Sequence, residues 1–382
     1  MRINKNKFRH TFLALISVLL IGTAIFCVSV RVTETQIIPS FDFLAAKLTL
    51  PVGNAEYSEI SDIPEEDSKI QTAESSILQS EVSESSVQNS SPITTKNSDF
   101  QSSKISDEEI TEYQNAHRGE EEYPIKEFTV TKGNQSYKNI QIKNASSTDI
   151  DIKKELEGKL GFTVENTNQP QVLIYHTHTC ESFLLYDTGY FYENFYPRTT
   201  DKNQNVCAVG EEISKQLNEA GIVTLHDKTI HDDPSYNGAY DRSMETINKY
   251  LEKYPSIKVV LDIHRDGIGT DTQKSKPVFT VNGKKAAQIM ILSGYNYDGS
   301  EEFKDWEYNL RFALKIQNTA QNMYPDMVRP LYFADFMYNM NVNTGSLLIE
   351  IGAESNTLEE VRYSGYLLGK VLSKVLNEAK ND

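Results

Sequence analysis

The sequence is short of cysteine and of positive charge, and both shortages narrow what it can encode. Its three cysteines, Cys27, Cys180 and Cys207, are too few for a disulfide framework, so buried free thiols at the last two are a simpler expectation than a bridge. Aspartate and glutamate outnumber lysine and arginine by 54 to 38, which gives a formal charge of −16. This chain lacks the basic footprint that nucleic-acid binding needs, and no nucleic-acid partner is expected.

Common enzyme motifs are also missing. The sequence has no P-loop, no Gly-x-Ser-x-Gly elbow and no Gly-x-Gly-x-x-Gly after a predicted strand. These absences argue against the common nucleotide-binding and serine-hydrolase classes. Any chemistry must therefore be sought among histidines and acidic residues.

One long hydrophobic run is present, over residues 11–30, and basic residues precede it. At 1.5 Å per residue such a helix is long enough to cross a bilayer core, with its basic flank in the cytoplasm. No clear cleavage site follows, so residues 1–30 are predicted to be an uncleaved transmembrane signal anchor; the alternative is a removed signal peptide. Both interpretations place the rest of the chain outside the cytoplasm, and the first makes a single-pass protein of the cell membrane.

The chain after the run divides by composition. Residues 31–122 are mostly polar with no sustained hydrophobic period, which predicts a disordered extracytoplasmic stalk. Residues 123–169 are predicted to form a small lead-in β module, with strands over 128–132 and 139–142 and a helix over 151–160.

Residues 170–382 alternate between strand and helix patterns. Strands are predicted over 172–175, 222–225, 259–263, 287–292 and 347–351, and helices over 206–220, 243–253 and 306–322. A capping box at Thr357 and Glu360 opens a last helix, to about residue 377. This alternation predicts an α/β fold with a mostly parallel sheet flanked by helices.

Three polar motifs fall at the ends of predicted buried strands, the edge of such a sheet where ligands bind. The first runs from His176 through His178 to Glu181. Imidazoles two residues apart point to one side of an extended chain, and a following carboxylate adds a third zinc-compatible ligand. The alternative is a pair of hydrogen-bonded structural histidines.

The second motif is Asp262-Ile-His264-Arg265-Asp266. His264 is placed at the same edge and would complete a three-ligand set; the alternative is a core histidine paired with Asp262 or Asp266. Arg265 suits an ion pair or a substrate clamp, because it keeps its proton at any relevant pH.

The third motif is a lone carboxylate, Glu350, within the apolar strand 347–351. An unpartnered buried carboxylate is costly, so Glu350 must face a cation, a donor network or solvent. Burial would also raise its pKa toward the range of a general base. The alternative is a salt bridge to Arg265 or to a lysine.

A second ligand-rich segment follows the strand 222–225. It contains His226, Asp227, His231, Asp232 and Asp233. Its end, Asp232-Asp233-Pro234, is more typical of a turn, so this segment ranks second as a metal site.

The motifs resemble the stage II sporulation protein P family of endospore-forming bacteria. The similarity extends over about residues 127–376, and it is carried by segments 172–181, 262–266, 338–339, 348–352 and 356–360. That family is similar to the zinc-dependent N-acetylmuramoyl-L-alanine amidases, whose α/β sheet holds the metal at its carboxyl edge.

The resemblance implies Zn²⁺ ligands at His178, Glu181 and His264 and a catalytic role for Glu350. Those amidases have no histidine at the position of His176, and their spacing from first histidine to glutamate is longer. Residues expected to support the ligands or to contact substrate are His176, Arg265, Asp266 and Asn339.

Family resemblance also implies a function. A membrane-anchored zinc hydrolase would remove stem peptides from peptidoglycan during sporulation engulfment, with possible endopeptidase activity, in a complex with stage II sporulation proteins D and M. The alternatives are a zinc endopeptidase or carboxypeptidase acting on stem peptides, and a catalytically silent wall-binding scaffold.

Overall fold

The computed structural model describes residues 99–103 and 105–380. The predicted anchor, residues 1–30, and residues 31–98 of the predicted stalk lie outside the described residues. Among the described helices, none combines the length and the apolar composition that a bilayer crossing requires.

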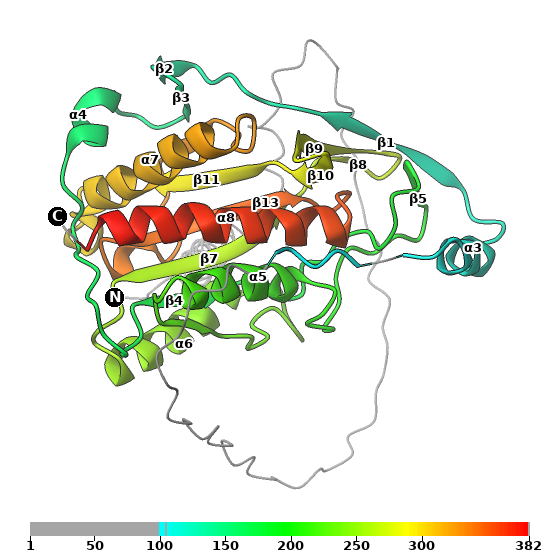
Figure 1. Cartoon of the computed structure of the whole chain (residues 1–382), viewed down its shortest axis with the longest axis horizontal. Helices are drawn as coiled ribbons and strands as arrows, with labels where there is room; N and C mark the ends of the chain where they lie inside the picture. The colour runs from blue at the N-terminus through cyan, green and yellow to red at the C-terminus, as the bar shows by residue number, and fades with distance from the viewer. Residues whose placement is uncertain (1–98, 104, 381–382) are drawn as a thin grey trace, which may run out of the picture. The chain divides into compact units, whose positions relative to one another are not determined.

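The larger of two sheets has eight strands in the order β2-β3-β12-β11-β13-β7-β4-β6 (Figure 1). Neighbours are parallel except for the pairs β2–β3 and β11–β13. The fold is therefore a mixed α/β fold whose sheet is mostly parallel. The strands are β2 (Gln135–Tyr137), β3 (Ile140–Asn144), β4 (Val172–Tyr175), β6 (Thr224–His226), β7 (Val259–Asp266), β11 (Ile289–Gly294), β12 (Leu331–Ala334) and β13 (Ser346–Ala353).

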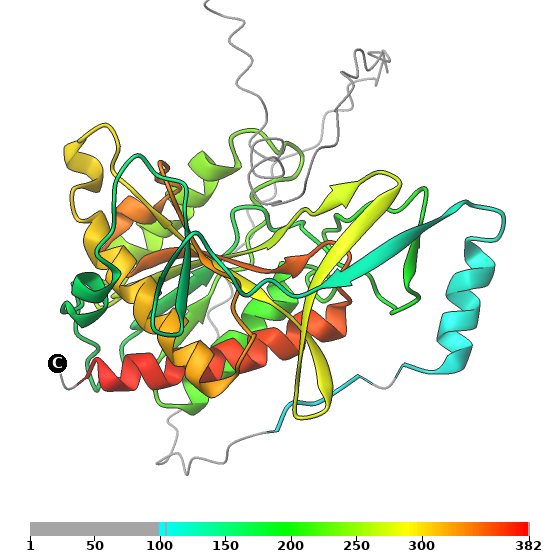
Figure 2. The same ribbon diagram turned by 90° about the horizontal axis from the view of Figure 1, so that it is seen from above.

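Helices cover both faces of this sheet. Helices α5 (Val206–Glu219), α7 (Trp306–Met323) and α8 (Leu358–Glu378) pack on one face, and α6 (Ala239–Lys253) packs on the other (Figure 2). In β4, Val172 and Ile174 belong to the main core beneath α5, α7 and α8, whereas Leu173 and Tyr175 pack with the α6 side. This burial on both faces explains why the strand is an unbroken apolar run.

Local signals place the helix ends close to where the sequence predicts them. Helix α5 ends at Glu219, and Ala220 is its C-cap. The next residue, Gly221, has φ 75°, the left-handed conformation that glycine adopts without strain. At the start of α8, Thr357 accepts a hydrogen bond from the Glu360 amide, and the Glu360 side chain accepts one from the Thr357 amide. The predicted capping box is confirmed.

The second sheet has the order β10-β9-β1-β5, with the short β8 (Gly269–Thr270) on β9. Its other strands are β10 (Lys284–Ala287), β9 (Gln273–Val281), β1 (Glu122–Phe128) and β5 (Tyr190–Tyr192). Asn282 and Gly283 both have positive φ between β9 and β10, the backbone conformation that an Asn-Gly pair adopts in a tight hairpin turn. Strand β1 ends where the predicted strand 128–132 begins.

Residues 123–169 do not form a module of their own. Strands β2 and β3 extend the main sheet beside β12, and β1 pairs with β9. Helix α4 (Ile152–Glu157) is tied to α7 by Glu155, whose carboxylate accepts a 2.8 Å hydrogen bond from Arg311. The prediction of a separate lead-in module is therefore wrong, because non-local strand pairing incorporates these short segments into both sheets.

The predicted stalk also extends too far along the chain. Helix α3 (Asp107–Ala116) begins with a capping box formed by Ser106 and Glu109, and Tyr113 lies in ring contact with Tyr186 and Tyr192. No residue of α3 is buried. The helix consequently has no strong apolar period, which is why composition alone suggests disorder.

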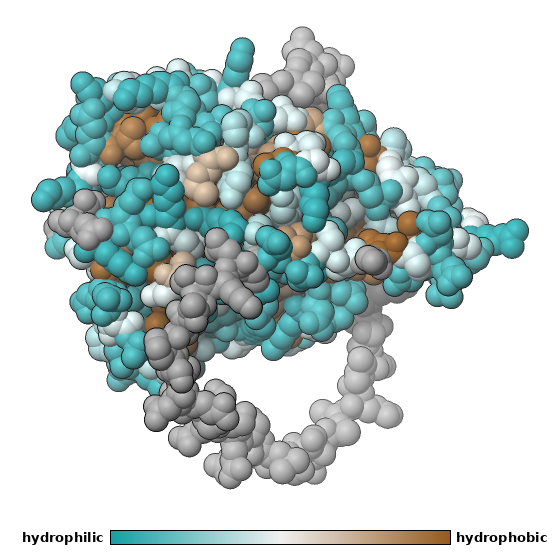
Figure 3. All heavy atoms as spheres, in the orientation of Figure 1, coloured by the Kyte–Doolittle hydropathy of each residue, from teal (hydrophilic) through white to brown (hydrophobic). Residues whose placement is uncertain are grey.

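The face on which α7 and α8 lie is mainly hydrophilic, and its hydrophobic residues gather in small, separate patches (Figure 3). This surface agrees with the excess of acidic residues in the chain.

Candidate metal centre

Strand register brings two of the three motifs together at the edge of the main sheet. Strands β7 and β13 are parallel, and His264 lies opposite Glu350 in their register. Strand β4 lies on the other side of β7, with Tyr175 opposite Asp262. Opposite residues in a pleated sheet point to the same face, so His264 and Glu350 lie on the face that α6 covers.

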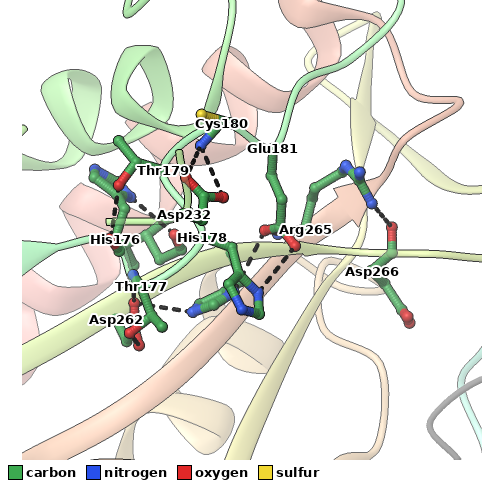
Figure 4. A network of polar contacts seen from close by, with 12 residues as sticks. His176, Thr177, His178, Thr179, Cys180, Glu181, Asp232, Asp262, Arg265 and Asp266 are labelled. Carbon is green, nitrogen blue, oxygen red and sulfur yellow. Dashed lines mark hydrogen bonds and ion pairs between the residues drawn. The ribbon is translucent and has the colours of Figure 1, made fainter. Parts of the chain in front are cut away.

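His178, Glu181 and His264 form a compact cluster at this edge, with one potential ligand atom from each within 4.8 Å of the others. The Glu181 carboxylate lies between the two rings: Oε1 is 3.6 Å from His178 Nδ1, and Oε2 is 3.4 Å from His264 Nδ1 (Figure 4). All three residues are buried. Two imidazoles and one carboxylate are a donor set that suits Zn²⁺ and leaves one coordination position for water or substrate.

The cluster is strongly polarised. Burial opposes charge on Glu181, but His264 and His178 hold the pKa of its carboxyl well below the usual range. Burial likewise disfavours a charged His264, yet Asp262 and Glu181 raise the pKa of this imidazole well above its ordinary value. A divalent cation bound in the cluster would take the place of the imidazolium proton that faces Glu181.

Glu181 is held by its local backbone. Its amide donates to the His178 carbonyl at 3.1 Å, which closes the turn after β4, and its Oε2 accepts a 3.1 Å hydrogen bond from the Arg265 amide. The three-residue spacing after His178 therefore suffices to bring the carboxylate back over β7.

Glu350 lies on β13 beside this cluster. Its Oε2 atom is buried and has no hydrogen-bond partner. Burial raises the pKa of its carboxyl to about 8. The Arg265 guanidinium donates to the carbonyls of Ser182, Pro197 and Asp266, so the predicted alternative of a salt bridge from Arg265 to Glu350 is wrong.

His176 does not join the cluster. Its Nδ1 lies 2.8 Å from the Ile263 carbonyl, and its Nε2 lies 2.9 Å from His226 Nε2. The expectation that His176 and His178 share one side of an extended chain is wrong, because the strand ends at Tyr175 and the chain turns. His176 packs toward α5, where a Cβ on Gly210 would come within 2.9 Å of its Nε2.

The other predicted support residues have structural partners. The guanidinium of Arg265 binds backbone carbonyls rather than an open site, and Asp266 forms a 2.8 Å buried ion pair with Arg329. Asn339 donates to the Tyr240 carbonyl and to Ser243 Oγ, which ties the loop before β13 to α6.

The second ligand-rich segment is spread over separate networks. His226 contacts His176, Asp227 accepts hydrogen bonds from Thr229 and Tyr250, and His231 Nε2 lies 2.9 Å from Thr246. Asp232 forms an ion pair with Arg198. It also accepts a hydrogen bond from the Cys180 amide (Figure 4). These partners account for His226, Asp227, His231 and Asp232 without a metal.

A further acidic group brings three carboxylates within 4.8 Å of one another. It consists of Glu127, Asp187 and Glu360. The buried ammonium of Lys276 lies 3.3, 2.8 and 2.9 Å from these three carboxylates, so a protein cation already occupies the group.

Cys180 and Cys207 are buried free thiols, as expected. Burial raises the pKa of each to about 12, so both remain protonated and unreactive near neutral pH.

Two residues near the cluster were not predicted to support it. Asp262 Oδ1 lies 2.9 Å from His264 Nε2, a pairing considered only as an alternative to metal binding. The ring of Tyr236 stacks on His178 with centroids 4.2 Å apart. The Asp-x-His spacing signals the first contact, but nothing local signals the second.

Fold and site together define a mixed α/β protein with a His–Glu–His cluster and a partly buried glutamate at the carboxyl edge of its sheet. The family model described as Stage II sporulation protein P (SpoIIP) matches residues 57–373. The chain belongs to this family.

Known proteins show similarity over parts of the chain. Stage II sporulation protein P of Bacillus subtilis (strain 168) is 25% identical over 220 residues, which cover 55% of this chain and 52% of that protein. The chain thus spans about half the length of this curated relative. Two N-acetylmuramoyl-L-alanine amidase structures, AmiC2 of Nostoc punctiforme and an amidase of Clostridium difficile 630, are 10% and 15% identical and align with TM-scores of 0.32 and 0.34. Each alignment covers 56% of this chain, and 98% and 99% of the two amidases.

Proposed function

We propose that this protein is a zinc-dependent hydrolase that cuts the amide bond between glycan and stem peptide in peptidoglycan during sporulation. The observation that carries the proposal is the convergence of His178, Glu181 and His264 next to Glu350, which lies in register with His264. Family membership supports the setting in sporulation.

His178, Glu181 and His264 would hold the metal. When bound in such a site, Zn²⁺ lowers the pKa of a coordinated water and polarises the scissile carbonyl. The protein's part is to hold the donors in place: the Arg265 amide fixes Glu181, and the β7 backbone fixes His264.

Glu350 would move the proton. Its Oε2, which has no partner in the folded protein, is available to accept a proton from the attacking water and to return it to the leaving amine. A carboxyl whose pKa lies near the working pH can do both, and burial brings Glu350 into this range.

We further propose that residues 1–30 anchor the chain in the cell membrane and that the hydrolase body acts outside the cytoplasm on the wall. In this setting its expected partners are peptidoglycan and stage II sporulation proteins D and M.

The test is digestion of purified sacculi by the zinc-loaded full chain, with the released fragments identified by mass spectrometry. An amidase releases intact stem peptides whose amino terminus is alanine and leaves unsubstituted glycan. Cleavage within stem peptides or cross-links would instead identify a peptidase. Absence of any released product from the zinc-loaded chain would refute the hydrolase proposal.

A further inference from the structure

Asp262 is a buried carboxylate two residues before the candidate ligand His264 on β7, and the proposed mechanism assigns it no role. Asp262 is only 2% exposed, so the charge of its carboxylate requires hydrogen-bond or ion-pair partners. Two donors come from Thr177, at the exit of β4: the amide lies 2.9 Å from Oδ1, and the hydroxyl lies 2.6 Å from Oδ2 (Figure 4). These bonds fix the plane of the carboxylate.

The Thr177 contact continues into a buried chain of hydrogen bonds. Thr177 Oγ1 lies 2.8 Å from Ser243 Oγ on α6, and Asn339 Nδ2 donates to Ser243 Oγ at 3.0 Å. Strand β7, the exit of β4, helix α6 and the loop before β13 thus all brace one carboxylate. Such a network restricts the positions that Asp262 can adopt.

The opposite side of Asp262 meets His264. Oδ1 lies 2.9 Å from His264 Nε2, a buried nitrogen that no aligned hydrogen bond satisfies. The other ring nitrogen, Nδ1, points to Glu181 Oε2 at 3.4 Å. One edge of the imidazole therefore faces the metal cluster and the other faces Asp262.

A neutral imidazole carries one proton, and only its unprotonated nitrogen can bind a metal. We propose that Asp262 is a positioning residue that keeps the proton of His264 on Nε2, so that Nδ1 is free to bind the metal together with His178 and Glu181. This role rests on the proposed metal site. Asp262 itself is not a further ligand, because both its oxygens accept from Thr177 and it lies on the far edge of the ring from Glu181.

The first test compares the Zn²⁺ affinity of the purified full chain with that of Asp262→Asn, by competition with a chromophoric chelator. The side-chain amide of the new asparagine can donate to His264 Nε2 and so stabilises the tautomer with its proton on Nδ1, which cannot bind the metal. We therefore expect zinc affinity to fall by about 10- to 100-fold. Asp266→Asn is the matched control: it makes the same change on the same strand, but Asp266 pairs with Arg329. The control should keep wild-type zinc affinity.

A folded Asp262→Asn chain that binds Zn²⁺ as tightly as wild type would overturn the positioning role, and so would an equal loss in Asp266→Asn. If Asp262→Asn does not fold, ¹⁵N-histidine NMR of the zinc-loaded wild type decides: a proton on His264 Nε2 supports the role, and a proton on Nδ1 overturns it. Zinc binding and hydrolysis can fail separately. If Asp262→Asn binds Zn²⁺ about 10- to 100-fold more weakly than wild type but the zinc-loaded wild type releases nothing from sacculi, the proposed hydrolysis is refuted and the role of Asp262 is still supported.

Discussion

Replacing Glu350 by glutamine should increase stability in the metal-free protein and abolish hydrolysis in the zinc-loaded one. The side chains have nearly the same shape, so the change removes the charge and leaves the packing. In the folded protein, one oxygen of the Glu350 carboxylate has no hydrogen-bond partner, and burial raises the pKa of the carboxyl from 4.5 to about 8.

The sign of the stability effect follows from proton binding. Between pH 4.5 and about 8 the folded chain holds a proton on Glu350 that the unfolded chain has released, so stability falls as pH rises through this window. The full pKa difference corresponds to roughly 5 kcal/mol. The side chain is partly exposed, and solvent screening reduces the expected effect to about 2 kcal/mol.

Urea unfolding of chelator-treated wild type and Glu350→Gln at a series of pH values measures this effect. The two proteins should have similar stability near pH 4.5, and the variant should be about 2 kcal/mol more stable near pH 8. A stability difference that does not change with pH would refute the reasoning.

The same pair of proteins tests the catalytic role. With Zn²⁺ bound, Glu350→Gln should retain the metal and lose about 10²- to 10⁴-fold of the rate of peptide release from sacculi. Unchanged release by a zinc-loaded variant would show that Glu350 is not the base.

Other substitutions probe the ligands and the packing. His264→Ala should lose both zinc and activity; full zinc occupancy by elemental analysis would contradict its role as a ligand. Lys276→Met should lower the free energy of unfolding in urea by roughly 3 to 5 kcal/mol, because it leaves the buried Glu360 carboxylate without its ion-pair partner. Lys285→Met, at the exposed neighbouring lysine, should lower it by less than about 1 kcal/mol. Equal losses in the two variants would argue against the buried ion cluster. Burial lowers the pKa of His176 to about 3, so the protein should lose at most roughly 5 kcal/mol of stability as pH falls from 6.5 toward 3. His176→Asn should reduce this loss of stability at acid pH. An unchanged pH dependence in the variant would contradict a buried neutral imidazole.

Much of the fold can be predicted from the sequence because its signals are local. Strand β4 is an apolar run that matches the prediction residue for residue, and α5 and α8 are delimited by Gly221 and by the Thr357 capping box. Such signals depend on backbone conformation and on neighbours a few residues away. The short strands β3 and β12 carry less information, since they pair with each other although they lie far apart in the chain.

The candidate site divides in the same way. Three motifs at strand ends identify which residues can carry chemistry, because a polar residue in a buried strand needs a partner. Sequence reasoning could not separate His176 from His178, since the choice depends on where the chain leaves the extended conformation. The turn after Tyr175 sends His176 toward α5 and leaves His178 beside Glu181.

By itself the sequence determined the residue types of a metal site and the strands that bear them, because hydrophobic patterning and capping act over a few residues. Only the tertiary structure decided which of these residues meet. The register of β7 against β13 sets His264 opposite Glu350, and the pairing of β4 with β7 brings Asp262 against Thr177. These choices depend on contacts between segments about 85 residues apart in the chain, which no local pattern encodes.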